Sequence, residues 1–292
     1  MPVTAFAPAK VNLYLHVTGR RADGYHLVDS LVAFADIGDR LTAEPANSLS
    51  LAVDGPEAAG LSATGDDNLV LGAARLLADE AGVFPGAALR LDKRLPVAAG
   101  IGGGSSDAAA ALLLLRELWG LSLEGEALCR LGARLGADIP ACVYRRAVWV
   151  GGVGERLEPA ASLPEAGILL ANPRKALPTA AVFAARRGPF SKTSRFAPMP
   201  NDVAGLAELL APRCNDLTEA AIGILPEVGA VLARLGQLPG CLLARMSGSG
   251  ATCFALFASR AAAEDARLVL GAAEPLWWCA AGSFIAETAH YR

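Results

Sequence analysis

The stretch that decides the fold is Pro96-Val-Ala-Ala-Gly-Ile-Gly-Gly-Gly-Ser-Ser-Asp107, which runs directly into the apolar residues 108–115. Its four glycines carry no Cβ atoms, so the backbone there can adopt positive φ and approach a ligand closely. A helix that starts after such a loop presents free peptide N–H groups and the positive end of its dipole. Together these features predict a site for phosphate groups, with a triphosphate as the natural occupant.

The loop differs from two widespread phosphate-binding patterns. No lysine follows the glycines, as a GxxxxGK loop requires, and a weak preceding strand with no ribose-binding acid downstream argues against a dinucleotide site. A glycine-rich turn that merely begins a buried helix is the structural alternative, but four glycines and two serines at one helix entrance disfavour it. Ser105 and Ser106 are expected to cap that helix. Asp107 would repel phosphates unless it faces away, caps the helix or meets a metal, and the sequence leaves these options open.

The bulk composition indicates a folded protein that is large enough for two domains. Of 292 residues, 53% are hydrophobic and 19% are charged, which is a globular composition. The formal net charge is −3, and no run of lysine or arginine overrides it. We therefore expect neither nucleic acid nor an anionic membrane as a partner.

The cysteines and the start of the chain indicate the compartment. Cysteines occur at positions 129, 142, 214, 241, 253 and 279, never as a CxxC pair and mostly among apolar neighbours. This pattern is typical of buried thiols in a reducing compartment rather than of disulfides or a metal site. The N-terminus has no basic region followed by an apolar one, and residues 108–115 are too few to span a bilayer. We expect a cytoplasmic protein.

Hydrophobic periodicity predicts strands and helices that mix without regular alternation. Residues 10–17 alternate like a strand, whereas the period becomes helical from Asn68 onward, with Asp67 or Asn68 as the cap. This mixture favours an α+β fold over a doubly wound sheet. Further strands are expected at residues 31–34, 41–44, 49–53, 88–92, 148–157 (a hairpin), 243–246, 253–257 and 284–287, and further helices after the glycine loop and at 123–135, 178–185, 203–210, 217–224, 226–235 and 261–270.

Two segments have the composition of connections. Residues 159–164 look like a linker, which predicts an N-terminal domain over residues 1–158 and a C-terminal domain over 165–292. Residues 188–200 are polar and bounded by prolines, so we expect a mobile loop there.

Three segments occur in the order that characterises one kinase superfamily. They are Pro8-Ala-Lys-Val-Asn-Leu13, the glycine loop, and Met246-Ser-Gly-Ser-Gly-Ala-Thr-Cys-Phe254. Together they resemble the signature motifs of the GHMP kinase superfamily. The resemblance implies a two-domain α+β fold with the active cleft between the domains, ATP as the phosphoryl donor and an alcohol as the acceptor.

The N-terminal stretch makes the resemblance more specific. Pro8-Ala-Lys-Val-Asn-Leu-Tyr-Leu-His-Val-Thr-Gly-Arg-Arg-Ala-Asp-Gly-Tyr-His26 is similar to the branch that phosphorylates the 2-hydroxyl of cytidine diphosphate-linked methylerythritol in the non-mevalonate isoprenoid pathway. This small molecule is the implied partner, bound by a monomer or homodimer. The alternatives are a GHMP kinase for another alcohol, or a nucleotide-binding sensor without activity. Further matches are Asp67-Asn-Leu-Val70, Asp92-Lys-Arg-Leu-Pro96, Leu135-Gly-Ala-Asp-Ile-Pro140 and Gly152-Val-Gly-Glu155.

Two residues are the candidate catalytic pair. A kinase that acts on an alcohol needs a group that accepts the hydroxyl proton and donors that stabilise the transferring phosphoryl group. Asp138 lies between a Gly-Ala turn and Pro140, on a constrained loop that suits a base. The resemblance implies that Asp138 is that base and that Lys10 is its partner, which lowers the pKa of the attacking hydroxyl. Taken alone, Asp138 could cap a turn and Lys10 could be a surface lysine.

The resemblance also implies contacts to both ligands. Tyr25, His26 and Phe183 would clamp the cytidine, through stacking and an imidazole hydrogen bond, and Asn12 and Thr179 would hold the methylerythritol hydroxyls. Taken alone, Tyr25 and His26 could close a turn and Phe183 could be core; His16 and His290 are interpreted as structural. The residues expected at ATP are Pro96, Val97, Ala98, Ala99, Gly100, Ile101, Gly102, Gly103, Gly104, Ser105, Ser106, Asn68, Leu69 and Lys93.

Some features of the pattern qualify these expectations. Ala98, Ala99 and Ile101 stand where related loops often carry glycines and leucine, so we expect an altered fit with activity intact. The Gly248-Ser-Gly250 turn could bring a loop of the second domain over the phosphates, or could simply enter a core strand. Mg²⁺ is expected with the nucleotide, held by phosphates, a serine such as Ser106 and water, because no acidic residue clearly offers a ligand.

Overall fold

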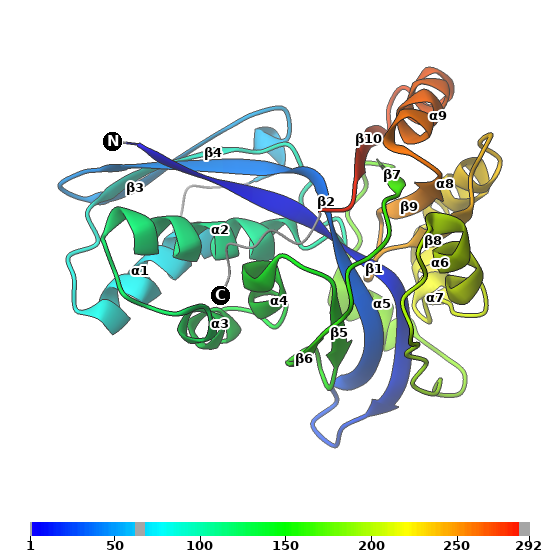
Figure 1. Ribbon diagram of the computed structural model, residues 1–292, viewed down its shortest axis with the longest axis horizontal. Coiled ribbons are helices and arrows are strands. Elements are labelled where there is room, and N and C mark those ends of the chain that lie inside the picture. The colour runs from blue at the N-terminus through cyan, green and yellow to red at the C-terminus, as the bar shows by residue number, and fades with distance from the viewer. Residues whose placement is uncertain (1, 62–67, 286–292) are drawn as a thin grey trace.

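The computed structural model describes residues 2–61 and 68–285, which form two β-sheets with helices packed around them (Figure 1). The first sheet has the strand order β3-β4-β2-β5-β6, with β1 paired to β2, and the second has the order β10-β7-β9-β8. The strands are β1 (Val3–Arg20), β2 (His26–Pro45), β3 (Leu49–Asp54), β4 (Ala87–Asp92), β5 (Val148–Gly151), β6 (Arg156–Pro159), β7 (Gly167–Asn172), β8 (Leu243–Met246), β9 (Cys253–Phe257) and β10 (Trp278–Ser283).

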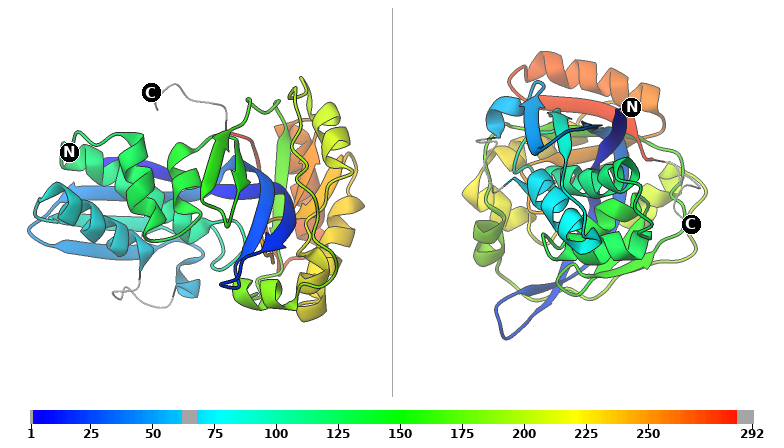
Figure 2. Two further views of the ribbon diagram at one scale, coloured as in Figure 1. Left: turned by 90° about the horizontal axis from the view of Figure 1, so that it is seen from below. Right: turned by 90° about the vertical axis from the view of Figure 1, so that its left-hand side faces the viewer.

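The helices divide between the two sheets (Figures 1 and 2). Helices α1–α4 pack with the first sheet in one hydrophobic core, and α7–α9 pack with the second sheet in another. The helices are η1 (Ala58–Gly60), α1 (Leu69–Ala81), α2 (Gly103–Leu118), α3 (Gly125–Ala133), α4 (Ile139–Tyr144), α5 (Thr179–Ala185), α6 (Val203–Leu210), α7 (Thr218–Ile224), α8 (Glu227–Gly236) and α9 (Arg260–Ala273).

Strand β1 is the element that both halves share. It pairs antiparallel with β2 along nearly its whole length, and its C-terminal part runs beside the second half of the molecule (Figure 1). Ala7 packs in the core of α1–α4, Val11 and Leu13 pack in a core between the two sheets, and Leu15 and Val17 reach the core of α7–α9. Because both faces of β1 are covered over residues 7–17, its apolar alternation is loose in the sequence.

The second sheet is covered on both faces, which the alternation along β7 makes clear. Leu169 and Ala171 face the core that α7–α9 complete. Ile168 and Leu170 face the opposite way, into the core that β1 and β2 share. A strand presents successive side chains to opposite faces, so β7 joins two cores.

Helix α2 is buried over most of its length because it is apolar on every side. Residues 106–115 are all buried, and Leu112 and Leu115 are fully covered. A helix that is hydrophobic all round belongs in the interior of a protein. The loop before the helix contacts the turn between β8 and β9, where the Thr252 N–H donates to the Ala99 carbonyl, so the glycine loop lies between the two halves.

The α+β fold predicted from the sequence is confirmed, and β8, β9 and α6 begin and end where expected. The strand expected at 284–287 stays a prediction: among the described residues the last strand is β10, which ends at Ser283, Phe284 forms an isolated bridge with Ala35, and residues 286–287 lie outside the described residues, as does His290. Strand β7 and helix α4 were not predicted. Asn68 caps α1 through its side chain, which accepts from the Val70 N–H at 2.9 Å, while Asp67 lies outside the described residues.

Two further sequence expectations concern connections. The strands of each sheet come from one side of residues 159–164, and the division into domains 1–158 and 165–292 stays a prediction. Residues 188–200 contain no helix or strand, but the Ser191 N–H donates to the Val17 carbonyl and the Ser194 N–H donates to the Asp29 carboxylate. Their mobility stays a prediction. Among the described residues, none of the helices has the length and apolar content that a membrane crossing requires.

Candidate active site

The glycine loop forms an uncapped helix start. Helix α2 begins at Gly103, with Gly102 as its N-cap at φ +64°, and no side chain caps the first turn. The expectation that Ser105 and Ser106 cap this helix is therefore wrong, because the helix starts two residues earlier and both serines lie inside it. The first-turn peptide N–H groups lie beside a cavity lined by Gly102–Ser105. This is the arrangement that binds anions at helix starts.

A second glycine turn closes against the first. The Thr252 N–H donates to the Ala99 carbonyl at 3.1 Å, and the Ser247 hydroxyl lies 3.2 Å from the Gly100 carbonyl oxygen. A Cβ placed on Gly100 would stand 2.4 Å from the Gly250 carbonyl oxygen, which is impossible without displacement of the backbone. Gly100 also has φ +75°, a conformation that side chains rarely allow. Glycine is required where the two turns touch.

The loop, β1 and the second turn enclose a cavity of about 470 Å³. It lies where both sheets meet, so residues from distant parts of the sequence contribute to its wall. The lining residues are Lys10, Asn12, Leu15, Val28, Ser30, Val32, Leu69, Ala98, Ala99, Gly100, Gly102, Gly103, Gly104, Ser105, Ala137, Asp138, Ala141, Val150, Val153, Gly154, Thr179, Phe183, Gly248 and Ser249.

Lys10 and Asp138 form an ion pair in the wall of this cavity. The Lys10 Nζ lies 2.8 Å from the Asp138 Oδ1, and the side chains are 7% and 47% exposed. Lys10 comes from β1, where its N–H donates to the Ile101 carbonyl at 2.9 Å, and its stem runs along Gly102. Asp138 precedes α4 as the N-cap residue. A buried cation thus holds a partly exposed carboxylate beside the phosphate loop.

Two polar pairs lie farther along the same cavity. The Asn12 amide donates to the Ser30 hydroxyl at 2.8 Å, while the buried Asn12 Oδ1 has no partner among the described residues. The hydroxyls of Thr179 and Ser249 are 2.8 Å apart, with either as the donor. These groups provide donors and acceptors for a polyhydroxylated ligand. Ser30 was not singled out in the sequence, because nothing distinguishes one serine within an apolar strand.

An adjoining cavity of about 660 Å³ has aromatic walls. The rings of His26 and Phe183 lie 5.2 Å apart at an angle of 30°, and Tyr25 is 66% exposed at the same cavity. Val28, Val153, Thr179 and Phe183 line both cavities, so the two adjoin. Burial and two nearby arginines lower the pKa of His26, so its imidazole is neutral at pH 7 and can both donate and accept.

Lys93 and Asp107 belong to a buried ion network beneath the loop. The Lys93 Nζ lies 2.7 Å from the Asp107 Oδ2 and 2.5 Å from the Asp39 Oδ2, and all three side chains are almost fully buried. Asp39 also accepts from the Arg94 and Leu95 N–H groups. Of the three options that the sequence left open, Asp107 faces away from the phosphate site. Lys93 does not line the cavity.

The predicted nucleotide residues thus fall into two groups. Eight of them line the cavity: Leu69, Ala98, Ala99, Gly100, Gly102, Gly103, Gly104 and Ser105. The others, Pro96, Val97, Ile101, Ser106, Asn68 and Lys93, do not line it: Ile101 is packed in the core between the sheets, Asn68 caps α1, and Val97 is exposed on the outside of the loop. A nucleotide contact at every one of these positions stays a prediction.

Comparison with known proteins identifies the family. The family model "GHMP kinases N terminal domain" matches residues 68–146, and "GHMP kinases C terminal" matches residues 197–275. The fold is shared with a homoserine kinase from Cytophaga hutchinsonii, at a TM-score of 0.70 and 16% identity over 98% of this chain and 95% of that one. Fold and family models together define a small-molecule kinase of the GHMP class, and kinases of this class depend on ATP.

Nearer relatives narrow the class. The 4-diphosphocytidyl-2-C-methyl-D-erythritol kinase of Paramagnetospirillum magneticum is 55% identical over 94% of this chain and 95% of the relative, and that of Rhodospirillum rubrum is 53% identical over 97% and 93%. A crystal structure of 4-(cytidine 5'-diphospho)-2C-methyl-D-erythritol kinase superposes with a TM-score of 0.81 at 36% identity, covering 98% of this chain and 100% of that one. The chain belongs to the 4-diphosphocytidyl-2-C-methyl-D-erythritol kinase family.

The contact between the two glycine turns generates a prediction about stability. Gly100→Ala should reduce the free energy of unfolding by about 2–4 kcal/mol, because the new Cβ meets the Gly250 backbone and the residue must keep a positive φ. Urea unfolding followed by circular dichroism measures the change. Gly271→Ala is the control, since a Cβ there meets no atom within 4 Å and should leave stability within about 1 kcal/mol of the parent. Equal stability of both variants would show that the turns separate freely.

Proposed function

We propose that the protein transfers the γ-phosphoryl group of ATP to the 2-hydroxyl of 4-diphosphocytidyl-2-C-methyl-D-erythritol, in the synthesis of isoprenoid precursors. The observation that carries the proposal is the Lys10–Asp138 pair in the wall of the cavity that the phosphate loop lines. The identity of the proposed substrate is inferred from the names of the relatives. The aromatic cavity that adjoins this site suits a nucleobase.

The phosphate end of ATP would lie against the start of α2. Peptide N–H groups of Gly103, Gly104 and Ser105 carry the partial positive charge of the helix start, which stabilises anions. The close contact of Gly100 with the second turn keeps this backbone in place without a bound ligand. Donors that are already positioned need no rearrangement as charge develops on the transferring group.

Asp138 is the proposed base. The acceptor oxygen attacks the γ-phosphorus in line, the bond from that phosphorus to the β–γ bridging oxygen breaks, and ADP leaves while the hydroxyl proton passes to Asp138. Lys10 holds the Asp138 Oδ1 at 2.8 Å and places a positive charge beside the reacting oxygens. No phosphoenzyme is needed, because a positioned base and electrostatic stabilisation are sufficient for direct transfer.

The cytidine would lie in the aromatic cavity. Tyr25 offers an exposed ring face, and Phe183 lies against His26 on the other wall. A neutral His26 can donate or accept at the cytosine edge. Asn12 and Thr179 stand between this cavity and the loop, where the unpartnered Asn12 Oδ1 could accept from a sugar hydroxyl.

Mg²⁺ fits this site as a companion of the nucleotide. The Ser106 hydroxyl, in the first turn of α2, has no partner among the described residues and is a hard oxygen of the kind that Mg²⁺ prefers, but Ser106 is buried and does not line the cavity, so its side chain would have to turn to reach the ion. Ser106 and the phosphates would hold the ion, which supplies charge neutralisation at the transferring group. The expected cytoplasmic location and the monomer or homodimer state remain predictions.

A direct assay tests the proposed substrate. The purified protein with ATP and Mg²⁺ should form ADP in the presence of 4-diphosphocytidyl-2-C-methyl-D-erythritol, and phosphorus NMR should place the new phosphate on the 2-hydroxyl. The control acceptors are mevalonate, homoserine and galactose. The first two are the compounds after which kinases of the same fold are named. Turnover of one of these instead would refute the substrate and leave the kinase class intact.

The proposed base makes a second prediction. Asp138→Asn should retain ATP affinity but lose at least about a hundredfold in kcat, the usual contribution of a positioned base. Calorimetry with a non-hydrolysable ATP analogue and steady-state kinetics separate the two quantities. Asp265→Asn, an exposed carboxylate on α9, controls for the loss of one negative charge. A kcat within threefold of the parent, or an equal loss of ATP affinity, would contradict the role of Asp138.

The phosphate loop makes a third prediction. Gly104→Ala should raise the KM for ATP by about tenfold or more, roughly 1.4 kcal/mol of binding, because the methyl group occupies the cavity wall. The fold should tolerate it, since the nearest atom to the new Cβ is the Leu69 Cδ1 at 3.5 Å. Gly125→Ala, also at a helix start and with no atom within 4 Å, is the control. An unchanged KM would place the phosphates elsewhere.

A further inference from the structure

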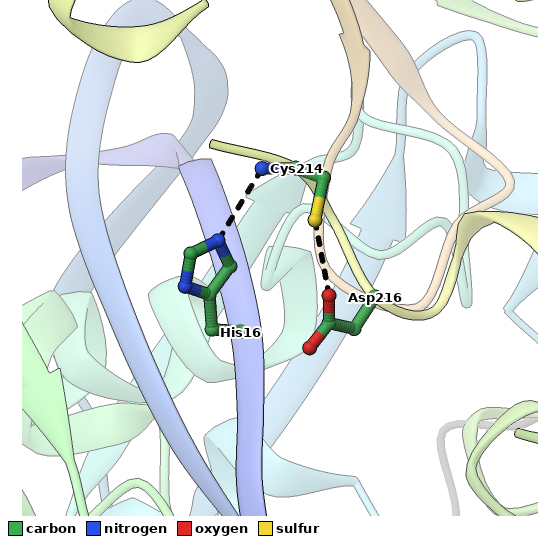
Figure 3. Close-up of side chains that lie close together, drawn as sticks. All are labelled: His16, Cys214 and Asp216. Atoms are coloured by element: carbon green, nitrogen blue, oxygen red, sulfur yellow. Dashed lines mark hydrogen bonds between the residues drawn. The ribbon is translucent and has the colours of Figure 1, made fainter. Parts of the chain in front are cut away.

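Three side chains that can bind a metal gather outside the active cavity. His16 on β1 and the pair Cys214 and Asp216, which precedes α7, bring a ring nitrogen, a thiol sulfur and a carboxylate oxygen within 4.8 Å of one another. Figure 3 shows the His16 ring facing the Cys214 backbone and the thiol facing Asp216. His16 and Cys214 are 198 positions apart, so no sequence motif reveals the cluster.

The backbone fixes the positions of these residues. The Leu15 N–H donates to the Cys214 carbonyl at 3.0 Å, and the Asp216 N–H donates to the Leu15 carbonyl at 2.8 Å. These bonds make a parallel bridge between Leu15 and Asn215. His16 therefore stands beside Cys214 and Asp216 as the next residue of a paired strand, and the three side chains need little rearrangement to converge.

Hydrogen bonds from outside the cluster orient two of the three ligands. The His16 Nδ1 lies 2.9 Å from the Lys192 carbonyl oxygen, to which it donates, so the Nε2 carries the lone pair; it accepts from the Cys214 N–H at 3.4 Å, a long hydrogen bond that a bound metal would replace. The Asp216 Oδ2 accepts from the Val17 N–H at 2.7 Å, which turns the Oδ1 toward the thiol. A histidine that donates its other nitrogen to a carbonyl, and a carboxylate with one oxygen held, are typical surroundings of metal ligands.

The thiol is accessible and carries a replaceable proton. Cys214 is the exposed one of the six cysteines and lines a cavity of about 530 Å³ together with Asp216. Burial of the sulfur, with the hydrogen bond and the charge of Asp216, raises the pKa of the Cys214 thiol to about 11. The thiol is therefore protonated at pH 7.5, and its proton points to the Asp216 Oδ1 at a sulfur–oxygen distance of 3.0 Å.

We propose that His16 Nε2, Cys214 Sγ and Asp216 Oδ1 bind one Zn²⁺-class ion, with solvent as the fourth ligand. A tetrahedral zinc site places such ligand atoms about 3.3–3.7 Å apart, so a small contraction of the present cluster is enough. The ion replaces the thiol proton, which leaves to solvent. Imidazole and thiolate select zinc or cobalt over the Mg²⁺ that accompanies ATP.

The charge of the proposed site is balanced. Thiolate and carboxylate together neutralise a divalent ion, which matters because Arg213 and Arg245 lie around the same cavity. Both guanidinium groups donate to backbone carbonyls, Arg213 to Ser194 and Arg245 to Leu13. The two guanidinium groups therefore stay in place. A metal site whose ligands cancel the charge of the ion is repelled less by these arginines than a bare divalent ion would be.

The site is connected to the active cavity through one residue. Asn215, which lies between the two proposed ligands, donates to the carbonyls of Met246 and Gly248 at 2.8 Å each. These carbonyls belong to the second glycine turn. An ion on Cys214 and Asp216 would therefore hold this turn more firmly, and we expect it to raise the thermal midpoint of the protein.

Cobalt titration of chelator-treated protein tests the proposal. One equivalent of Co²⁺ should produce a sulfur-to-cobalt charge-transfer band with the visible absorption of a tetrahedral ion, and Zn²⁺ should displace it. Calorimetry in buffers of different ionisation enthalpy should show about one proton released per ion, because the thiol is protonated beforehand. The absence of the band in the parent protein would overturn the proposal.

Matched variants locate the ion. Cys214→Ser should abolish the charge-transfer band, His16→Gln should weaken Co²⁺ binding at least tenfold, and Cys129→Ser, the same change at a half-buried cysteine of α3, should leave both unchanged. Zn²⁺ should raise the thermal midpoint of the parent and of Cys129→Ser but not that of Cys214→Ser. A band that survives in Cys214→Ser, or that disappears in Cys129→Ser, would assign the metal to other residues and refute the site.

Discussion

At Gly100 and Gly250, turns that belong to different halves of the chain come so close that a Cβ on Gly100 would stand 2.4 Å from the Gly250 carbonyl oxygen. The phosphate-binding part of the cleft depends on this contact. It holds the start of α2 in the position where its N–H groups line the cavity, and it closes the cavity on the side of the second sheet. A side chain at Gly100, or at Gly248, whose Cβ would stand 2.6 Å from the Gly100 carbonyl oxygen, would push the two turns apart, and the phosphate loop would lose its outer wall.

Strand β1 connects the contact between the two turns to the residues proposed to act in the reaction. Within a few residues it supplies Lys10 to the ion pair, Asn12 to the polar wall and His16 to the proposed metal site. A paired strand that contributes to three hydrophobic cores is rigid, so the side chains it carries keep fixed positions relative to one another. The Asn12 N–H also donates to the Ser247 hydroxyl, which connects the strand to the second turn.

Much of this could be predicted from the sequence, because local composition decided it. The glycine loop before an apolar helix and the α+β mixture follow from local composition, whereas the Lys10–Asp138 pair was implied by the family resemblance and not by neighbouring residues. What escaped prediction depends on distant neighbours: β7 is apolar on both faces because two cores meet on it, so it shows no alternation. The prediction that Ser105 and Ser106 cap α2 failed for a local reason, since Gly102 itself is the N-cap and adopts a positive φ there.

The position of Asp107 shows why a carboxylate is tolerated five residues after the N-cap of a helix that should bind phosphates. Its charge is directed at Lys93, which Asp39 holds from the other side. Burial favours the neutral acid and raises the pKa of Asp107, while the charge of the Lys93 ammonium group opposes that shift. The protonation of Asp107 is therefore controlled by Lys93 and not by groups in the cavity. The network therefore anchors the helix start from beneath and leaves its upper side, where the N–H groups lie, with a positive potential.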